Sequence, residues 1–223
     1  MTDLVRPFPP VNFLDQAKAD LESGLDTVVE LIPAPEVLAW VKRTFLTIGS
    51  PLYNPEHEHI ADLIDAAEEG TGFLTFAWAS APAKNKNSLV LGQCERVAFR
   101  AGGWQKARQE QQMREWFGFT PTYLITLDAS YCETATDREF CALVDHELCH
   151  IGVERDADGE MITSNVTGLP KHRLVNHDVE EFFDTVRRWG ANSNTKRLAN
   201  IANTAPFVPD AEVERGCGAV VIK

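Results

Sequence analysis

The stretch TPTYLITLDASYCETATDREFCALVDHELCH, residues 120–150, decides the fold of this 223-residue chain. Its first part, residues 120–131, is rich in β-branched and aromatic residues, and the alternating apolar side chains of 123–127 predict a strand. Its second part opens with Thr136 and Glu139, which have the T-x-x-E spacing of a capping box. Apolar residues then recur every three or four positions, as in an amphipathic helix with one buried stripe. The stripe consists of Phe140, Val144, Leu148 and Ile151.

The predicted helix contains the pattern H-E-x-x-H, from His146 through Glu147 to His150. Residues four apart lie on one helix face, with about 5–6 Å between Cβ atoms. Two imidazoles at that spacing can bind one Zn²⁺ at about 2.0–2.1 Å each. Glu147 can then serve as general base for a water molecule that the zinc activates. The alternative is that the two histidines occupy a solvated helix face, but the capped helix and the preceding strand favour zinc.

A third zinc ligand must come from elsewhere, because a catalytic zinc usually has three protein ligands and one water. His177 is the best candidate, since it opens a predicted amphipathic helix over residues 177–189 whose apolar side would pack on the core. Its position on the helical wheel points away from that apolar side. Glu180 or Glu181 therefore remain alternatives, by analogy with two-His-one-Glu sites, and His172 is a weaker one.

The neighbouring polar residues receive supporting roles. His57 and His59 are two residues apart and cannot share a helix face, so we interpret them as structural. Cys149 lies about 100° around the helix from the second motif histidine, and we expect it to be a small buried residue. Asp145 and Asp178 are possible acceptors for the second N–H of a metal-bound imidazole. Asp178 could equally stabilise a helix N-terminus.

Composition restricts the classes of partner. A net charge of −12 and a pI near 4.9 argue against nucleic-acid binding, which depends on Lys and Arg neutralising phosphates. We find no apolar run long enough to cross a membrane and no secretory signal. The 5 cysteines form an odd set without close-paired spacing, which fits a reducing compartment. We therefore expect a cytoplasmic protein that acts on a protein or peptide.

Outside the central stretch the sequence alternates helical and strand-like segments. Residues 72–80 and 88–100 are predicted to form a β-hairpin across a turn-forming connection. Together with strand 120–131 they make a small mixed or antiparallel sheet of three to five strands, packed against the H-E-x-x-H helix in an α+β fold. A strand of this kind can bind an extended substrate by β-addition. We expect an extended or helical arm over residues 1–47, a domain over 48–190 and an extended tail over 191–223.

Three segments together resemble the phage metallopeptidase family. They are SPLYNPEHEHIADL (50–63), LVDHELCHIGVERDADGE (143–160) and NHDVEEF (176–182). The resemblance implies a zincin-type metallopeptidase encoded by a phage or prophage. The zinc ligands that it implies are His146, His150 and His177. There is a looser similarity to SprT-like proteases, in which a third histidine opens a helix and an aromatic residue follows; here that spacing is one residue longer.

Two functions follow from these observations. The first is a zinc-dependent endopeptidase acting in the host-cell cytoplasm, with Glu147 as general base and Tyr123 or Tyr131 as a candidate donor to the scissile carbonyl. The second is a non-catalytic, zinc-stabilised phage accessory or virion protein that binds another protein. A fourth protein ligand would indicate a closed structural site, whereas an open water position would favour catalysis.

Overall fold

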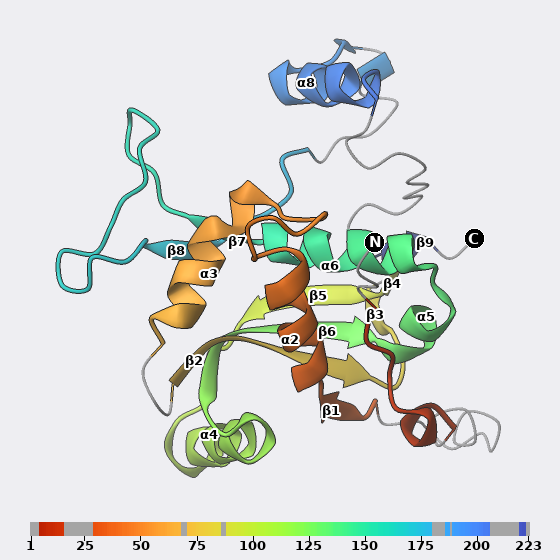
Figure 1. The fold of residues 1–223 in the computed structure, drawn as a ribbon, viewed down its shortest axis with the longest axis vertical. Coiled ribbons are helices and arrows are strands. Elements are labelled where there is room, and N and C mark those ends of the chain that lie inside the picture. The colour runs from red at the N-terminus through yellow and green to blue at the C-terminus, as the bar shows by residue number, and fades with distance from the viewer. Residues whose placement is uncertain are drawn as a thin grey trace.

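The computed structural model confirms an α+β fold built around a four-stranded mixed sheet (Figure 1). It describes residues 5–15, 29–67, 71–85, 88–179, 186–187, 189–205 and 219–221. Within these ranges no helix is both long enough and apolar enough to cross a membrane. The four cysteines in them, Cys94, Cys132, Cys141 and Cys149, are free thiols.

The central sheet has the strand order β1-β2-β6-β5. β6 (Thr120–Asp128) pairs in parallel with β2 (Thr71–Ala79) and antiparallel with β5 (Gly92–Arg96). β1 (Leu31–Pro33) completes the other edge, antiparallel to β2. β6 is therefore an interior strand, and β5 is an edge strand. Four apolar side chains of β6 are buried: Tyr123, Leu124, Ile125 and Leu127. The alternation predicted this for Tyr123, Ile125 and Leu127.

The predicted hairpin between residues 72–80 and 88–100 is wrong. β2 and β5 do not pair with each other, because β6 lies between them and pairs with both. A smaller hairpin of β3 (Ala83–Asn85) and β4 (Ser88–Val90) occupies the connection, and β4 also pairs with β9 (Ala219–Val221). Local turn residues favoured the hairpin, whereas the apolar β6 buries its side chains best in the sheet interior.

The helix that carries the motif, α6 (Asp137–Cys149), forms as predicted. The Thr136 hydroxyl accepts a hydrogen bond from the Glu139 amide, and the Glu139 carboxylate accepts one from the Thr136 amide, which confirms the capping box. The predicted stripe faces the core, and each of its side chains is at most 1% exposed. This burial fixes the rotation of α6, so that His146 and His150 are directed away from the core stripe.

The other helices surround the same core. α2 (Pro35–Thr44) packs on β2, and Trp40 and Trp78 both contact the ring of Phe140. β1 and α2 belong to residues 1–47, and they join the same sheet and core as the later elements. The remaining elements before α6 are the 3-10 helix η1 (Pro55–His57), α3 (Glu58–Asp65), α4 (Gly103–Phe117) and α5 (Ala129–Thr134). Figure 1 shows α4 and α6 on opposite sides of the sheet.

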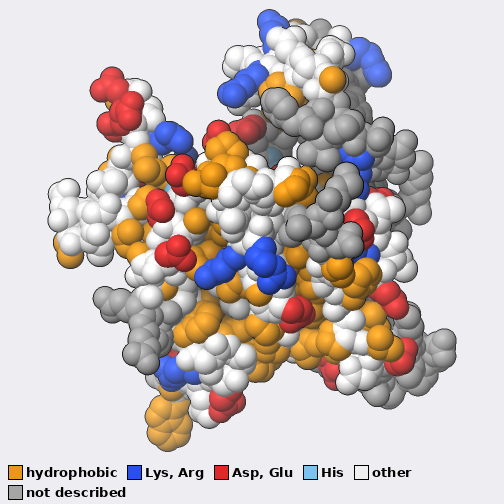
Figure 2. All heavy atoms as spheres, viewed as in Figure 1, with side chains coloured by type: hydrophobic (Ala, Val, Ile, Leu, Met, Phe, Trp, Pro, Cys, Tyr) orange, Lys and Arg blue, Asp and Glu red, His pale blue; other side chains and the backbone are white. Residues whose placement is uncertain are grey.

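The C-terminal part differs from the extended tail that we predicted. Residues 193–202 form a helix, α8 (Ser193–Ala202), which Asn192 caps by accepting a hydrogen bond from the Thr195 amide. Trp189, the last residue of the helix predicted over residues 177–189, is 80% exposed. Figure 2 shows acidic side chains scattered over several elements of this face rather than gathered in one patch.

Candidate metal centre

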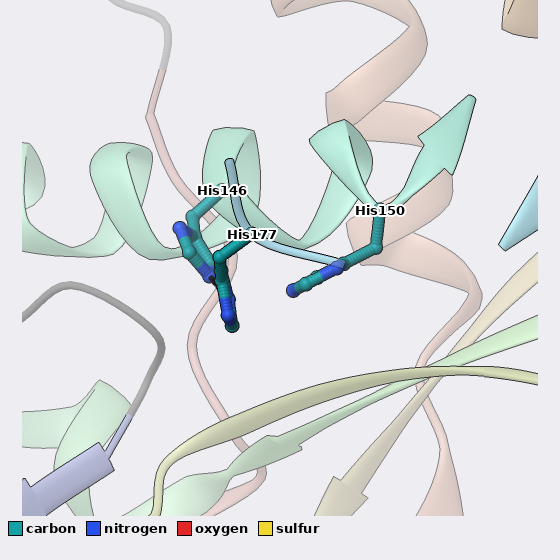
Figure 3. A group of neighbouring side chains, drawn as sticks. All are labelled: His146, His150 and His177. Carbon is teal, nitrogen blue, oxygen red and sulfur yellow. Dashed lines mark hydrogen bonds between the residues drawn. The ribbon is translucent and has the colours of Figure 1, made fainter. Parts of the chain in front are cut away.

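Three histidine side chains converge beside α6. His146 and His150 project from one face of the helix, and His177 reaches them from the segment that follows β8 (His172–Leu174) (Figure 3). One ligand nitrogen of each lies within 4.8 Å of the others, and all three side chains are half-buried. No other cluster of three metal-ligating side chains occurs in the described ranges. The structure thus brings together the three histidines that the sequence singled out.

The spacing of these nitrogens fits a single small cation. Nε2 of His146 and Nε2 of His177 are 3.2 Å apart. Two nitrogens bound to one tetrahedral zinc at about 2.0–2.1 Å would be about 3.3 Å apart. The His150 ring centroid lies 5.1 Å from that of His146 and 4.8 Å from that of His177. The three rings therefore need little rearrangement to share an ion.

The protonation states of the rings also suit a cation. Nδ1 of His150 lies 2.7 Å from the Val175 carbonyl oxygen. A carbonyl only accepts, so Nδ1 carries the proton and the lone pair is on Nε2. Burial, together with the neighbouring His150 and His177, lowers the pKa of His146 to about 4. His146 is thus neutral at physiological pH and able to act as a ligand.

Glu147 faces the edge strand β5 rather than solvent. Glu147 is only 1% exposed. Burial raises the pKa of the Glu147 carboxyl to about 7, although the positive charge of protonated His150 and a hydrogen bond from the Cys94 amide act in the opposite direction. A carboxyl with such a pKa can accept and release a proton near neutral pH.

Asp145 does not orient a metal-facing imidazole, contrary to one of our expectations. Its Oδ1 atom accepts hydrogen bonds from His57 Nε2 at 2.7 Å and from Asn54 Nδ2 at 3.1 Å. His59 Nε2 donates to the carbonyl of Ile151 at 2.7 Å. Both histidines of the NPEHEHI segment therefore connect η1 and α3 to α6 and its exit. A structural role was expected from their two-residue spacing, but that spacing does not indicate these partners.

His172, the weaker alternative ligand, lies outside the three-histidine cluster. His172 Nδ1 is 3.0 Å from the hydroxyl of Tyr123, and that tyrosine is fully buried. Glu180 and Glu181 fall outside the described residues. Cys149, predicted to be buried, is exposed, because the core stripe covers the other side of α6. The Val175 carbonyl was missed, since a backbone acceptor leaves no trace in the sequence.

The substrate strand that we expected is also placed differently. β6 pairs on both sides and has no free edge. β5 is an edge strand of this sheet, and it packs against α6. Any β-addition to this sheet beside the histidines must therefore use β5.

Comparison with known proteins decides the family. Residues 38–203 match the family model described as "Putative phage metallopeptidase". The chain belongs to this family. No curated protein and no solved structure gives a significant match to this chain. Its family membership therefore rests on the family model.

Proposed function

We propose that this protein is a zinc-dependent endopeptidase. In the proposal His146, His150 and His177 hold the zinc ion, and Glu147 is the general base. The observation that carries it is the convergence of three imidazoles, two of them in an H-E-x-x-H helix, next to a buried carboxylate. The family model supports a metallopeptidase but specifies neither the metal nor the catalytic residues.

Each residue has a defined task in this proposal. Bound zinc would supply Lewis acidity, which lowers the pKa of water and polarises a carbonyl. Glu147 takes a proton from the attacking water and delivers it to the leaving amine. The hydrogen bond from His150 to Val175 holds that ring in one tautomer and one orientation.

The donor set favours catalysis over a purely structural zinc. Structural zinc sites normally have four protein ligands, whereas catalytic sites have three and leave one position for water. Among the described residues three histidines form the cluster, and no cysteine or carboxylate joins them. This observation weighs against the non-catalytic accessory or virion protein, which remains the second candidate.

The proposed substrate is a protein or peptide in the host-cell cytoplasm. An extended peptide can add to the edge of a sheet through main-chain hydrogen bonds. The edge strand β5 runs beside Glu147, whose carboxylate accepts the outward Cys94 N–H, so a peptide paired with the other outward groups of β5 would pass close to the general base.

The decisive experiment combines metal analysis with an assay for hydrolysis of unfolded protein substrates. The purified protein should contain about one equivalent of zinc; chelation should abolish hydrolysis, and zinc should restore it. Glu147→Gln should keep the zinc and lose rate by at least ~100-fold, the range for general-base removal. Glu58→Gln, on the exposed first turn of α3, is the matched control and should behave like the wild type. Absence of bound metal, with no effect of chelation, would overturn the proposal.

A further inference from the structure

α6 packs tightly against the sheet at Gly92, the first residue of β5. A Cβ atom added there would lie 2.8 Å from Glu147 Oε1 and 2.9 Å from Leu143 Cδ1. Carbon atoms do not approach such neighbours below about 3.0 Å without displacing them. The backbone of Gly92 does not have a positive φ, so the requirement for glycine here is one of space.

A second contact between β5 and Glu147 lies two residues further along the strand. In an antiparallel pair, successive residues direct their backbone groups alternately toward and away from the partner strand. The carbonyl of Leu91 and the amide of Val97 both bond to β6. Cys94 lies three residues from each of them, so its backbone amide is directed the other way, out of the free edge of β5. There the Glu147 carboxylate accepts its hydrogen bond.

We propose that Gly92 is a positioning residue for Glu147, acting together with the Cys94 amide. The missing side chain of Gly92 lets the carboxylate lie against β5, and the Cys94 N–H fixes its orientation there. A glutamate has three side-chain torsions, and these two contacts select one arrangement before substrate binds. This inference rests on the proposed role of Glu147 as general base.

The competing explanation is that Gly92 only allows α6 to pack. Leu143 approaches the same point as closely as Glu147 does, so an added methyl group would press on both. The two explanations differ in what repairs the defect. In a Gly92→Ala variant, truncation of Leu143 would give α6 room to pack and so would relieve a packing defect entirely. It would not return the Glu147 carboxylate to its original position, because the added methyl group still occupies that space.

The kinetic test uses the zinc-loaded protein. Gly92→Ala should lower kcat by about 10- to 100-fold, the effect of misplacing a catalytic group by about 1 Å, with KM and zinc content unchanged. Gly102→Ala is the matched control, since nothing lies within 4 Å of its added Cβ, and it should retain kcat. Adding Leu143→Ala to Gly92→Ala should leave kcat low. Full recovery of kcat in that double variant, or a wild-type kcat in Gly92→Ala, would overturn the inference.

A second readout does not depend on activity or on changing Gly92. Amide hydrogen exchange of Cys94 in the metal-free protein should be slow in the wild type and at least about tenfold faster in Glu147→Ala, because the outward N–H then loses its acceptor. Equal exchange in both proteins would contradict the positioning contact. If Glu147→Gln remains active, the proposed function itself fails. If Glu147→Gln is inactive and Gly92→Ala has full activity, only the positioning inference fails.

Discussion

Two histidine pairs in this protein have opposite environments. His57 and His59, in η1 and α3, each bond to a fixed acceptor, the Asp145 carboxylate and the Ile151 carbonyl. His146, in α6, and His150, at the C-cap of α6, lie next to a third imidazole, and one ligand nitrogen of each ring lies within 4.8 Å of the others (Figure 3). His57 and His59 connect helices to one another, whereas His146 and His150 have nitrogen lone pairs available for a metal ion.

The contrast shows that spacing is only half of what distinguishes a candidate ligand from a structural histidine. A separation of four residues places two rings on one helix face, whereas a separation of two sends them apart. The other half is whether each ring nitrogen already has a partner. Substitutions of His146 or His150 should therefore affect zinc binding, whereas substitutions of His57 or His59 should affect stability.

His146→Ala should remove stoichiometric zinc binding and abolish hydrolysis. Loss of one of three imidazoles should lower zinc affinity by more than ~100-fold, since even changes in residues behind a ligand cost 10- to 100-fold. Competition with a fluorescent zinc chelator measures the affinity. Binding of one equivalent with wild-type affinity in this variant would remove His146 from the site.

Removal of the metal should destabilise the wild type and leave His146→Ala unaffected. Zinc at about 1,000 times its dissociation constant contributes about 4 kcal/mol to the free energy of unfolding. Thermal melts with zinc and with chelator measure the difference. A similar zinc-dependent rise in Tm in His146→Ala would mean that the metal binds elsewhere.

His57→Ala should affect stability instead of metal binding. The residue is 1% exposed, and its loss leaves the Asp145 carboxylate with one hydrogen-bond donor fewer. The expected loss in the free energy of unfolding is about 1–2 kcal/mol, since water can reach the partly exposed Asp145 carboxylate. Urea denaturation measures the stability, and zinc content should remain near one equivalent. Loss of zinc without loss of stability would reverse the roles of the two pairs.

The smallest effect concerns pH. Burial lowers the pKa of His59 below its ordinary value of 6.5, and the hydrogen bond to Ile151 only partly offsets this. The folded protein therefore binds fewer protons at this residue than the unfolded chain, so its contribution to stability is complete above pH 6.5 and decreases as the pH falls below that value. In the metal-free protein, His59→Gln should weaken the fall of unfolding free energy between pH 6.5 and more acidic values. An unchanged pH dependence would show that His59 does not contribute.

The parts that sequence predicted well are those with local causes. The capping box of Thr136 and the apolar stripe of α6 depend on neighbouring residues, and both occur as expected. The pairing of β2 and β5 was mispredicted because β6, distant in the sequence, competes for both strands. Strand order is a non-local property, and turn residues alone do not encode it.

The site shows the same division between local and distant causes. The H-E-x-x-H spacing pointed to His146 and His150, and the NHDVEEF segment pointed to His177. The contact between His57 and Asp145 spans 88 positions and could not be inferred. Gly92 left a usable indication, because a glycine inside a predicted strand often marks a close approach by another element.

Anomalous diffraction at the zinc absorption edge from crystals of the zinc-loaded protein locates the ion directly. A catalytic centre should give one strong peak about 2.0–2.1 Å from a ring nitrogen of each of His146, His150 and His177, with the fourth position open to solvent. A peak at another place, or a fourth protein side chain bound to the ion, would contradict a catalytic zinc centre.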